Sequence, residues 1–286
     1  MNYLLDTSNL LYKGFYSYPN HPCAEVFYLL SKIKSFLQTS NNSHVYLCID
    51  GKPKGKCIDE NYKANRIKEG VSVYRHLPQV IYMLQGLHRV HIKYNPELEA
   101  DEVIFSLSRL LDNPCVIVST DNDLLQALNN KVEILRKDII INEEYYRAEM
   151  FSKFHSVNPE RLPVYRAIVG DVSDNLKPPV PRFSKEIASD LANSISYNGE
   201  APSKETIIEY RKSREKELSE ARLKSIDRLI DNYNLFKSNF EIMKLSVHTD
   251  LDYSYLKDNP LLPNFPSDIL GIYRIIKVLD SISQEE

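Results

Sequence analysis

Acidic side chains stand at five separated places in this chain, mostly where a strand or a turn is expected to end. The nine positions are Asp6, Asp50, Glu99, Asp101, Glu102, Asp121, Asp123, Asp171 and Asp174. Because carboxylates repel one another, a fold that gathers them needs cations to hold them, and hard oxygen ligands suit Mg²⁺ or Mn²⁺. A pair of such ions is a standard device for cutting phosphodiester bonds. The pattern therefore predicts a reaction as well as a fold.

Short, continuously apolar runs precede several of these acids and are typical of strands buried on both faces. The expected strands cover residues 2–5, 45–49, 115–119 and 131–135, with a further candidate at 139–141. Helix-like stretches alternate with them at 24–38, 74–87, 100–111 and 122–129. This alternation predicts an α/β fold with a mostly parallel central sheet flanked by helices. The active crevice of such folds lies beyond the carboxyl ends of the strands, so the strand-end acids are expected to converge there.

The strands are expected to stop near residue 143, which divides the chain into two regions. We predict an α/β metal-binding core over residues 1–143 and a helical region over 144–286. Within the second region, residues 204–232 are expected to form one long charge-rich helix or a pair of helices. A terminal apolar helix is expected near 268–282.

Composition places the chain among ordinary globular proteins, with 43% hydrophobic and 26% charged residues. The net charge of −3 argues against a uniformly basic surface for nucleic acid but leaves room for a local basic stripe. The four cysteines show no CxxC spacing, and no basic leader or membrane-length apolar run occurs. These observations predict a cytoplasmic protein with reduced thiols.

Each acid taken singly has a structural explanation that is at least as good as a functional one. A lone Asp at a strand end is commonly a helix N-cap, and acids such as Glu99 and Asp101 are favoured at the start of a helix. These explanations do not account for an acid at every strand end. They also leave unexplained the matching pairs Glu99-x-Asp101 and Asp121-x-Asp123. A third pair, Asp171-x-x-Asp174, spans about one helical turn.

Six sequence motifs carry a resemblance to a known family. They are LLDTSNLLYKGFY, IDGKPKG, YKANR, LEADEVI, STDNDLLQAL and GDVSDN. Their order and spacing resemble those of the flap endonuclease superfamily, in particular phage 5′-exonucleases and the 5′-nuclease domain of bacterial family-A DNA polymerases. The resemblance covers roughly residues 1–195, and GDVSDN with the upstream acidic motifs is specific as a set.

The resemblance implies a distribution of the acids between two metal ions. Asp6, Asp50, Glu99 and Asp101 would hold the first ion. Asp121, Asp123 and Asp171 would hold the second, with Asp101 near both ions and essential for catalysis. Asp174 would act directly or through bound water. Glu102 stands where many relatives have a second Asp and is one methylene longer, so its place as a direct metal ligand is left open.

A basic stretch lies at residues 51–76, with seven basic residues against three acidic ones, a local excess of +4. Such an excess beside an acidic metal centre suits a phosphate backbone guided to the ions. The resemblance places Lys63 and Arg66 in a helical arch around the single-stranded 5′ end, where they neutralise the scissile phosphate. Tyr62 is a candidate platform for base stacking. An ordinary solvated helix is the alternative reading of this stretch.

The segment after GDVSDN departs from the family, which has a Gly-rich hairpin there that contacts duplex phosphates, often with a bound potassium ion. Both expected glycines are absent from residues 176–183, and proline removes a backbone donor and fixes φ. We therefore expect an altered grip on the downstream duplex, and the sequence does not support the potassium site. Lys177, Arg182 and Lys185 are the candidate DNA contacts, with plain surface charge as the alternative.

Together these features predict a structure-selective 5′-nuclease, a flap endonuclease or 5′–3′ exonuclease that uses two Mg²⁺ or Mn²⁺ ions. Branched or 5′-ended DNA, or an RNA–DNA primer, is the expected substrate, and a monomer that meets replication proteins is the expected state. The helical region would bind DNA and brace the core. Two alternatives remain open: a single-strand RNase of the PIN type, and a non-catalytic DNA-binding homologue.

Overall fold

A six-stranded sheet forms the centre of the computed structural model, which describes residues 1–18, 20–21, 23–52, 73–136, 145–171, 174–260 and 277. The strands lie in the order β3-β2-β1-β4-β5-β6. Their bounds are β1 Asn2–Asp6, β2 His44–Ile49, β3 Val90–Tyr94, β4 Cys115–Val118, β5 Val132–Leu135 and β6 Tyr145–Tyr146. The first five are parallel and β6 is antiparallel to β5. The predicted α/β fold with a mostly parallel sheet is therefore confirmed.

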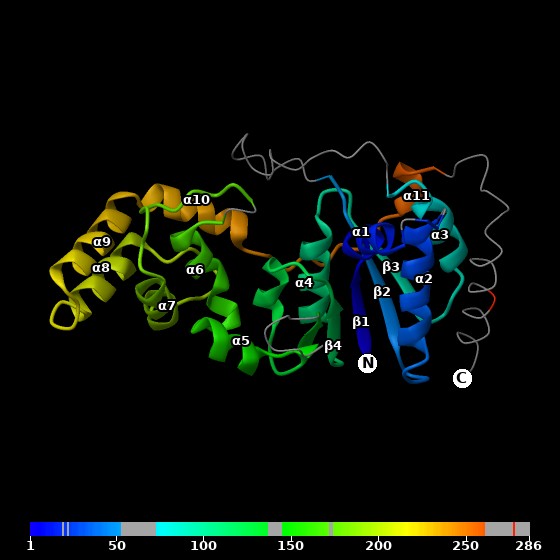
Figure 1. Cartoon of the computed structure of the whole chain (residues 1–286), viewed down its shortest axis with the longest axis horizontal. Helices are drawn as coiled ribbons and strands as arrows, with labels where there is room; N and C mark the ends of the chain where they lie inside the picture. Colours follow the sequence, from blue (N-terminus) through cyan, green and yellow to red (C-terminus); the bar gives the residue numbers. More distant parts are fainter. Residues whose placement is uncertain are drawn as a thin grey trace.

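Helices cover both faces of the sheet, which explains why its strands are apolar throughout (Figure 1). Leu5 belongs to the core cluster on one face and Leu4 to the cluster on the other, and both side chains are fully buried. The first cluster is completed by α1 Thr7–Ser17, α2 Ala24–Leu37 and α3 Leu77–Leu84. The second is completed by α4 Ala100–Leu110 and the short 3-10 helix η1 Asp123–Ala127.

The register of the central strands brings the strand-end acids to one edge. Asp6 is paired with Cys48, and Leu5 is paired with both Leu47 and Val118. Asp50 therefore follows β2 by one residue at the level where β1 also ends. The chain that leaves β4 passes the same edge. Parallel strands thus place the acids that follow them in one crevice.

A helical region lies beside the sheet and has a hydrophobic cluster of its own (Figure 1). Its elements are α5 Ala148–His155, η2 Pro159–Arg161, α6 Leu162–Val169, α7 Lys185–Ser194, α8 Lys204–Ser213, α9 Glu220–Asp231 and α10 Tyr233–Met243. α8 and α9 are the predicted helical pair within 204–232. Phe236 and Phe240 of α10 are fully buried against α6 and α7.

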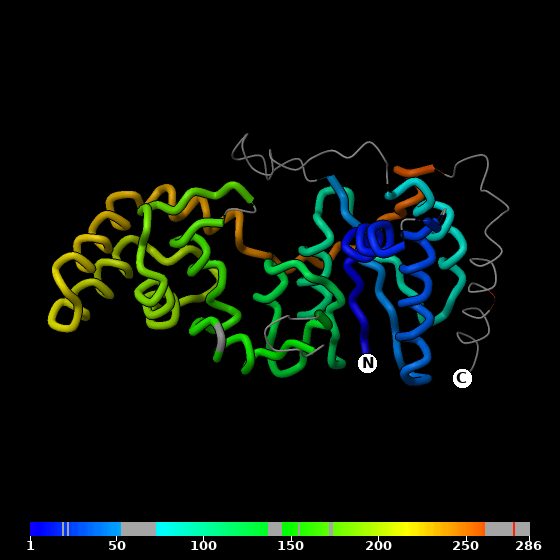
Figure 2. Tube along the Cα trace, in the orientation of Figure 1, coloured from blue at the N-terminus to red at the C-terminus, as the bar shows by residue number. Residues whose placement is uncertain are grey.

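The chain returns from the helical region to the sheet, as the tube in Figure 2 shows. Leu245 and Leu251 join the core cluster around α4, and Tyr255 joins the cluster on the other face. Tyr255 begins α11 Tyr255–Asp258, which packs against α3. Tyr94 at the end of β3 exchanges backbone hydrogen bonds with this returning segment. Residues near 245–258 thus pack in the α/β core, which the sequence analysis predicted to consist of residues 1–143.

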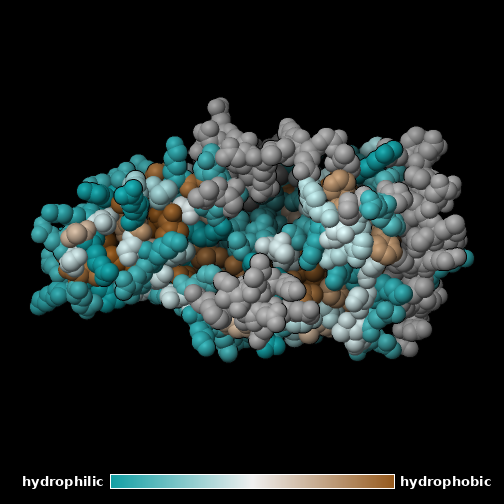
Figure 3. Space-filling model, in the orientation of Figure 1, coloured by the Kyte–Doolittle hydropathy of each residue, from teal (hydrophilic) through white to brown (hydrophobic). Residues whose placement is uncertain are grey.

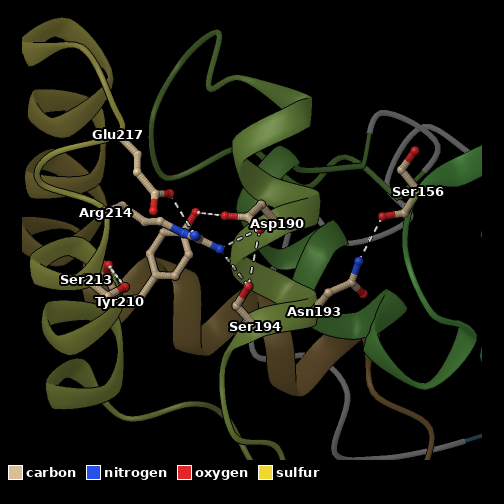
Figure 4. A network of polar contacts seen from close by, with 8 residues as sticks. All are labelled: Ser156, Asp190, Asn193, Ser194, Tyr210, Ser213, Arg214 and Glu217. Carbon is tan, nitrogen blue, oxygen red and sulfur yellow. Dashed lines mark hydrogen bonds and ion pairs between the residues drawn. The ribbon is translucent and has the colours of Figure 1, made fainter.

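Polar contacts brace α7 against α8 (Figure 4). The Tyr210 hydroxyl donates to Asp190 Oδ2 at 2.7 Å, and Arg214 Nη2 donates to Asp190 Oδ1 at 3.0 Å. On the other side of α7, Asn193 Nδ2 donates to the Ser156 carbonyl at 2.9 Å. Burial, followed by the hydrogen bond to Asp190, raises the pKa of Tyr210, so the phenol stays a donor. These contacts fix α7, which follows the hairpin.

Several element predictions differ from the structure. α1 and β3 were not predicted, because residues 7–17 are rich in polar and tyrosine side chains and β3 mixes apolar with polar residues at the sheet edge. Residues 122–129 form only the short η1. β6 lies beyond residue 143, where strands were expected to stop. The predicted strand at 139–141 lies outside the described residues, as does the predicted helix at 268–282 except for residue 277.

The described surface in the view of Figure 3 is largely hydrophilic, in keeping with the charged fraction of the sequence. Among the helices described, none combines the length and apolar character needed to cross a bilayer.

Candidate metal centre

Five carboxylates line one cavity at the carboxyl edge of the sheet. The cavity has a volume of about 380 Å³ and is also lined by Ser8, Asn9, Tyr12 and Tyr74. The five acids are Asp6, Asp50, Glu99, Asp101 and Asp121. None of the described residues that line it is a lysine or an arginine. We call these five residues the sheet-edge group.

Asp6 is fixed in this group by its place at the junction of β1 and α1. Its Oδ1 caps α1 by accepting the Asn9 amide at 3.0 Å, and its Oδ2 accepts the Ser119 hydroxyl at 2.7 Å. Burial raises the pKa of Asp6 to about 7, and the charges of Asp50 and Asp121 add to the rise. The two hydrogen bonds act in the opposite direction but do not cancel it. Burial is thus the main cause of the raised pKa of Asp6, and the neighbouring carboxylates add to it.

Asp50 is held between β2 and the start of α4. Its Oδ1 accepts the Ala100 amide at 2.8 Å, and its Oδ2 accepts the Ser8 hydroxyl. Gly51 makes this close approach possible, because a Cβ there would lie 2.2 Å from the Asn95 carbonyl oxygen and 2.7 Å from that of Leu98. Steric crowding therefore explains why a glycine follows Asp50.

The acidic start of α4 divides into two roles. Glu99 and Asp101 line the cavity, whereas the Glu102 side chain closes a capping box with the Glu99 amide. Glu102 is 7% exposed, is absent from the cavity lining, and has Oε1 3.8 Å from Nε2 of His248. The structure thus gives Glu102 a structural position, while its predicted role as a metal ligand stays untested.

Three further carboxylates form a second group, which we call the α6-end group. Ligand oxygens of Asp123, Asp171 and Asp174 lie within 4.8 Å of one another. Asp123 begins η1, and its amide donates to Asp121 Oδ1 at 2.8 Å, so Asp121 stands between the two groups.

Asp171 and Asp174 follow the end of α6, in a stretch where Asp171 pairs with Leu176. Asp171 and Leu176 exchange backbone hydrogen bonds of 2.9 and 2.7 Å. Gly170 has a φ of 76°, and a Cβ there would lie 2.7 Å from the Leu176 carbonyl oxygen. Glycine is therefore required where the chain leaves α6.

Arg166 is a site residue that the sequence reasoning missed. Its guanidinium forms ion pairs with both Asp123 and Asp171, and its side chain is 13% exposed. It lies on α6 one turn before Gly170, and this placement of a basic residue before GDVSDN was the available signal.

The predicted DNA contacts fall into two sets. Tyr62, Lys63 and Arg66 lie outside the described residues. The remaining three, Lys177, Arg182 and Lys185, are exposed on the hairpin and the first turn of α7. Arg182 has a φ of 59°, a left-handed conformation in which glycine is the usual residue. The segment 176–183 therefore includes a left-handed position that is occupied by an arginine.

The cap of α7 takes up one backbone donor that a phosphate would otherwise meet. Ser184 accepts the Ile187 amide at 3.4 Å. The prolines of the hairpin supply no amide hydrogen at all. An altered grip on duplex DNA stays a prediction, supported by these two features.

Comparison with known proteins identifies the family of the chain. The model of the 5′–3′ exonuclease N-terminal resolvase-like domain matches residues 1–155. The chain belongs to this family. It is 28% identical over 208 residues to DNA polymerase I of Caldicellulosiruptor bescii, and the aligned region covers 68% of this chain and 24% of that protein. It is 27% identical over 187 residues to the 5′–3′ exonuclease of Aquifex aeolicus, 61% of this chain and 63% of that protein.

The chain therefore spans about a quarter to just under two thirds of the length of these two relatives. Solved structures with the same fold include the T5 D15 protein co-crystallised with metal ions. That match has a TM-score of 0.62 and 15% identity, and it covers 99% of this chain and 96% of that one. The catalytic core of Rad2 in complex with a DNA substrate matches with a TM-score of 0.55 and 11% identity over 98% and 92% of the two chains.

Both acidic groups have the chemistry that a divalent cation requires. Carboxylate oxygens are hard ligands suited to Mg²⁺ or Mn²⁺. The sheet-edge group offers such oxygens in one cavity, and ligand oxygens of the α6-end group lie within 4.8 Å of one another.

Proposed function

We propose that this member of the 5′–3′ exonuclease family is a structure-selective 5′-nuclease that hydrolyses DNA phosphodiesters with two divalent ions. The observation that carries the proposal is the convergence of five carboxylates in one cavity at the carboxyl edge of the sheet. The α6-end group adjoins it through the hydrogen bond between Asp121 and the Asp123 amide. The family match supports a nuclease as the class of enzyme.

The residues that would hold the ions follow from this arrangement. Asp6, Asp50, Glu99 and Asp101 would hold the first ion, and Asp121, Asp123 and Asp171 the second, with Asp174 acting directly or through water. Bound there, a pair of divalent ions supplies an activated water and stabilises the leaving oxygen. Ser8 and Ser119 orient Asp50 and Asp6, and the Ala100 amide fixes the second oxygen of Asp50.

The substrate in this proposal is branched or 5′-ended DNA, including a flap or an RNA–DNA primer. Two structures with the same fold, of a T5 flap endonuclease and of the catalytic core of Rad2, are complexes with DNA, which supports DNA as the polymer. Lys63 and Arg66 would neutralise the scissile phosphate and Tyr62 would stack on a base. Lys177, Arg182 and Lys185, exposed near the hairpin, would meet the duplex. The protein would act in the cytoplasm as a monomer, in replication or primer removal.

A cleavage assay tests the proposal directly. Purified protein is mixed with a 5′-labelled DNA flap and, separately, with single-stranded RNA, each with Mg²⁺ and with excess chelator. We expect metal-dependent cutting near the flap junction. Cutting that continues in chelator would exclude the metal mechanism, and faster cutting of the RNA would favour the PIN-type alternative.

The non-catalytic alternative needs a measurement that does not depend on activity. Calorimetric titration with Mn²⁺ serves this purpose, because a homologue that has lost its metal chemistry would show no uptake that depends on the acids. We expect uptake by the wild-type chain and its loss when Asp6 and Asp101 are both changed to Asn. Uptake that survives this double change would place the ions elsewhere.

A further inference from the structure

The two acidic groups differ in how their charge is compensated. The sheet-edge group has five carboxylates, and its described lining holds no basic side chain. The α6-end group has three carboxylates and one guanidinium, because Arg166 forms ion pairs with Asp123 and Asp171. Arg166 thus contacts two of the side chains whose oxygen atoms a second ion would use. An ion and Arg166 therefore compete for the oxygens of these two carboxylates.

Arg166 is firmly placed for this contact. α6 is anchored by Val164, Ala167 and Ile168, which are all fully buried in the cluster of the helical region. The side chains of Arg166, Asp123 and Asp171 are 13%, 15% and 9% exposed, so the ion pairs are largely removed from water. Guanidinium presents a planar fork of donors that suits two carboxylates as well as a phosphate.

Removing the partners of a buried charge is costly, because the charge is left without compensation. An ion that enters the α6-end group takes oxygens of Asp123 and Asp171 from Arg166. The guanidinium then needs another anion in the same place. A phosphate group of the substrate is the anion that a nuclease brings to this site, and it matches the same fork.

We propose that Arg166 is a positioning residue that couples the second divalent ion to the arrival of a substrate phosphate. Without phosphate, Arg166 compensates the α6-end group and keeps its ion affinity low. With phosphate, the guanidinium passes from the carboxylates to the phosphate, and the carboxylates become ligands. Coupling of this kind is reciprocal, so the ion also raises the affinity for phosphate. This inference rests on the proposed nuclease function and deepens it.

The test counts ions and does not depend on cleavage. Mn²⁺ is titrated calorimetrically into the wild-type protein and the Arg166→Met variant, each without and with a saturating deoxynucleoside 5′-monophosphate, which offers a phosphate but no phosphodiester to cut. We expect the wild type to take up one ion tightly without the nucleotide and two with it. Arg166→Met should take up two without the nucleotide, with the second bound about tenfold tighter or more than in the wild type.

Arg211→Met is the matched control. Arg211 also pairs with two carboxylates, those of Asp227 and Glu215, but it lies between α8 and α9. Its variant should keep the wild-type ion counts. Melting in chelator monitors the fold: Arg166→Met should melt lower than wild type, and Mn²⁺ should raise its melting temperature by more. If Arg166→Met does not fold without metal, Arg166→Lys keeps the charge without the fork and should fall between the two.

The outcomes separate this inference from the proposed function. A wild type that takes up two ions equally well without nucleotide overturns the role of Arg166 alone. Equal ion counts in Arg166→Met and wild type without nucleotide do the same. A wild type that takes up no Mn²⁺ under any condition overturns the metal-dependent nuclease itself.

Discussion

The sheet-edge group and the α6-end group solve the same electrostatic problem in different ways. In the first, carboxylates at the ends of parallel strands are held by the fold, and burial, with a smaller contribution from the charges of Asp50 and Asp121, raises the pKa of Asp6. In the second, Arg166 lies among the carboxylates and compensates part of their charge. The second group therefore holds a basic side chain, whereas the described lining of the first holds none.

The difference follows from where each group sits. Strand ends offer backbone and hydroxyl donors, such as the Asn9 amide and Ser119, but no long basic side chain reaches the described lining. The α6-end group lies where the helical region meets the core, so a helix can supply Arg166. Predictions that treat the groups separately can break or sharpen this contrast.

The largest expected effect is at Asp101, which lines the sheet-edge cavity. Its neighbour Glu102 does not line this cavity. Asp101→Asn should lower the rate of flap cleavage by about 10³-fold or more while DNA binding is retained. Glu102→Gln should stay within about threefold, because Gln can fill the same place in a capping box. Single-turnover cleavage of both variants measures the contrast. Equal losses in the two variants would make Glu102 a ligand and contradict the division at the start of α4.

A smaller loss is expected in the α6-end group. Asp171→Asn removes one carboxylate from a group that Arg166 already compensates in part, and it should lower cleavage by roughly 10²-fold. Ion uptake by the sheet-edge group should be unchanged, which calorimetry with Mn²⁺ can measure. Loss of all Mn²⁺ uptake in this variant would show that the two groups form one site.

The sequence predicted the sheet-edge group because its logic is local. Asp6, Asp50 and Asp121 follow apolar runs, and parallel strands bring their carboxyl ends together. Glu99 and Asp101, which were singled out by their spacing at the start of a helix, line the same cavity. Ligand oxygens of Asp123, Asp171 and Asp174 lie within 4.8 Å of one another, while the role of these residues as metal ligands stays a prediction.

What the sequence did not reveal depends on packing between distant segments. Arg166 becomes a site residue only because α6 lies against η1, a contact across more than 40 positions. Glu102 could not be separated from Asp101 by spacing, since the capping box depends on the backbone angle at Glu99. β3 was missed because an edge strand with half-buried polar residues lacks the apolar run on which the prediction relied.

Asp6 offers a test of stability against function. Its pKa is raised from 3.8 to about 7, so the folded state binds a proton that the unfolded state has already released. The contribution of Asp6 to the stability of the metal-free protein should therefore be most favourable below pH 4, and it should become less favourable as the pH rises to about 7. Asp6→Asn can keep the cap on α1 and removes the charge. It should be more stable than wild type at pH 8 without metal, by up to about 4 kcal/mol, yet inactive.

Denaturant unfolding in chelator at pH 5 and pH 8 measures this effect. The advantage of Asp6→Asn should shrink at pH 5, and saturating Mn²⁺ should reverse it, since only the wild type gains the ion. An Asp6→Asn protein that is less stable than wild type at pH 8 in chelator would mean that the ionised Asp6 carboxylate does not destabilise the folded state.

The smallest expected effect lies near the amino-terminal ends of β2 and β3, away from the carboxyl edge of the sheet. His91 Nε2 is 3.0 Å from Nδ1 of His44, and His91 stacks on Tyr46. Burial lowers the pKa of His91 to about 4, with His44, Lys93 and His88 adding to the fall and Asp252 opposing it.

Here the pH dependence has the opposite sign to that of Asp6. The folded state resists a proton that the unfolded state accepts near pH 6.5, so stability should fall as the pH drops from about 6.5 to 4. Because His91 is partly exposed, solvent screening reduces the effect to about 1 kcal/mol. His91→Gln should remove that acid sensitivity, as followed by urea unfolding at pH 7 and pH 4.5, and should leave flap cleavage unchanged. If His91→Gln altered cleavage as strongly as Asp171→Asn, the two ends of the sheet would not be independent. The contrast between the two acidic groups would then have to include the whole sheet.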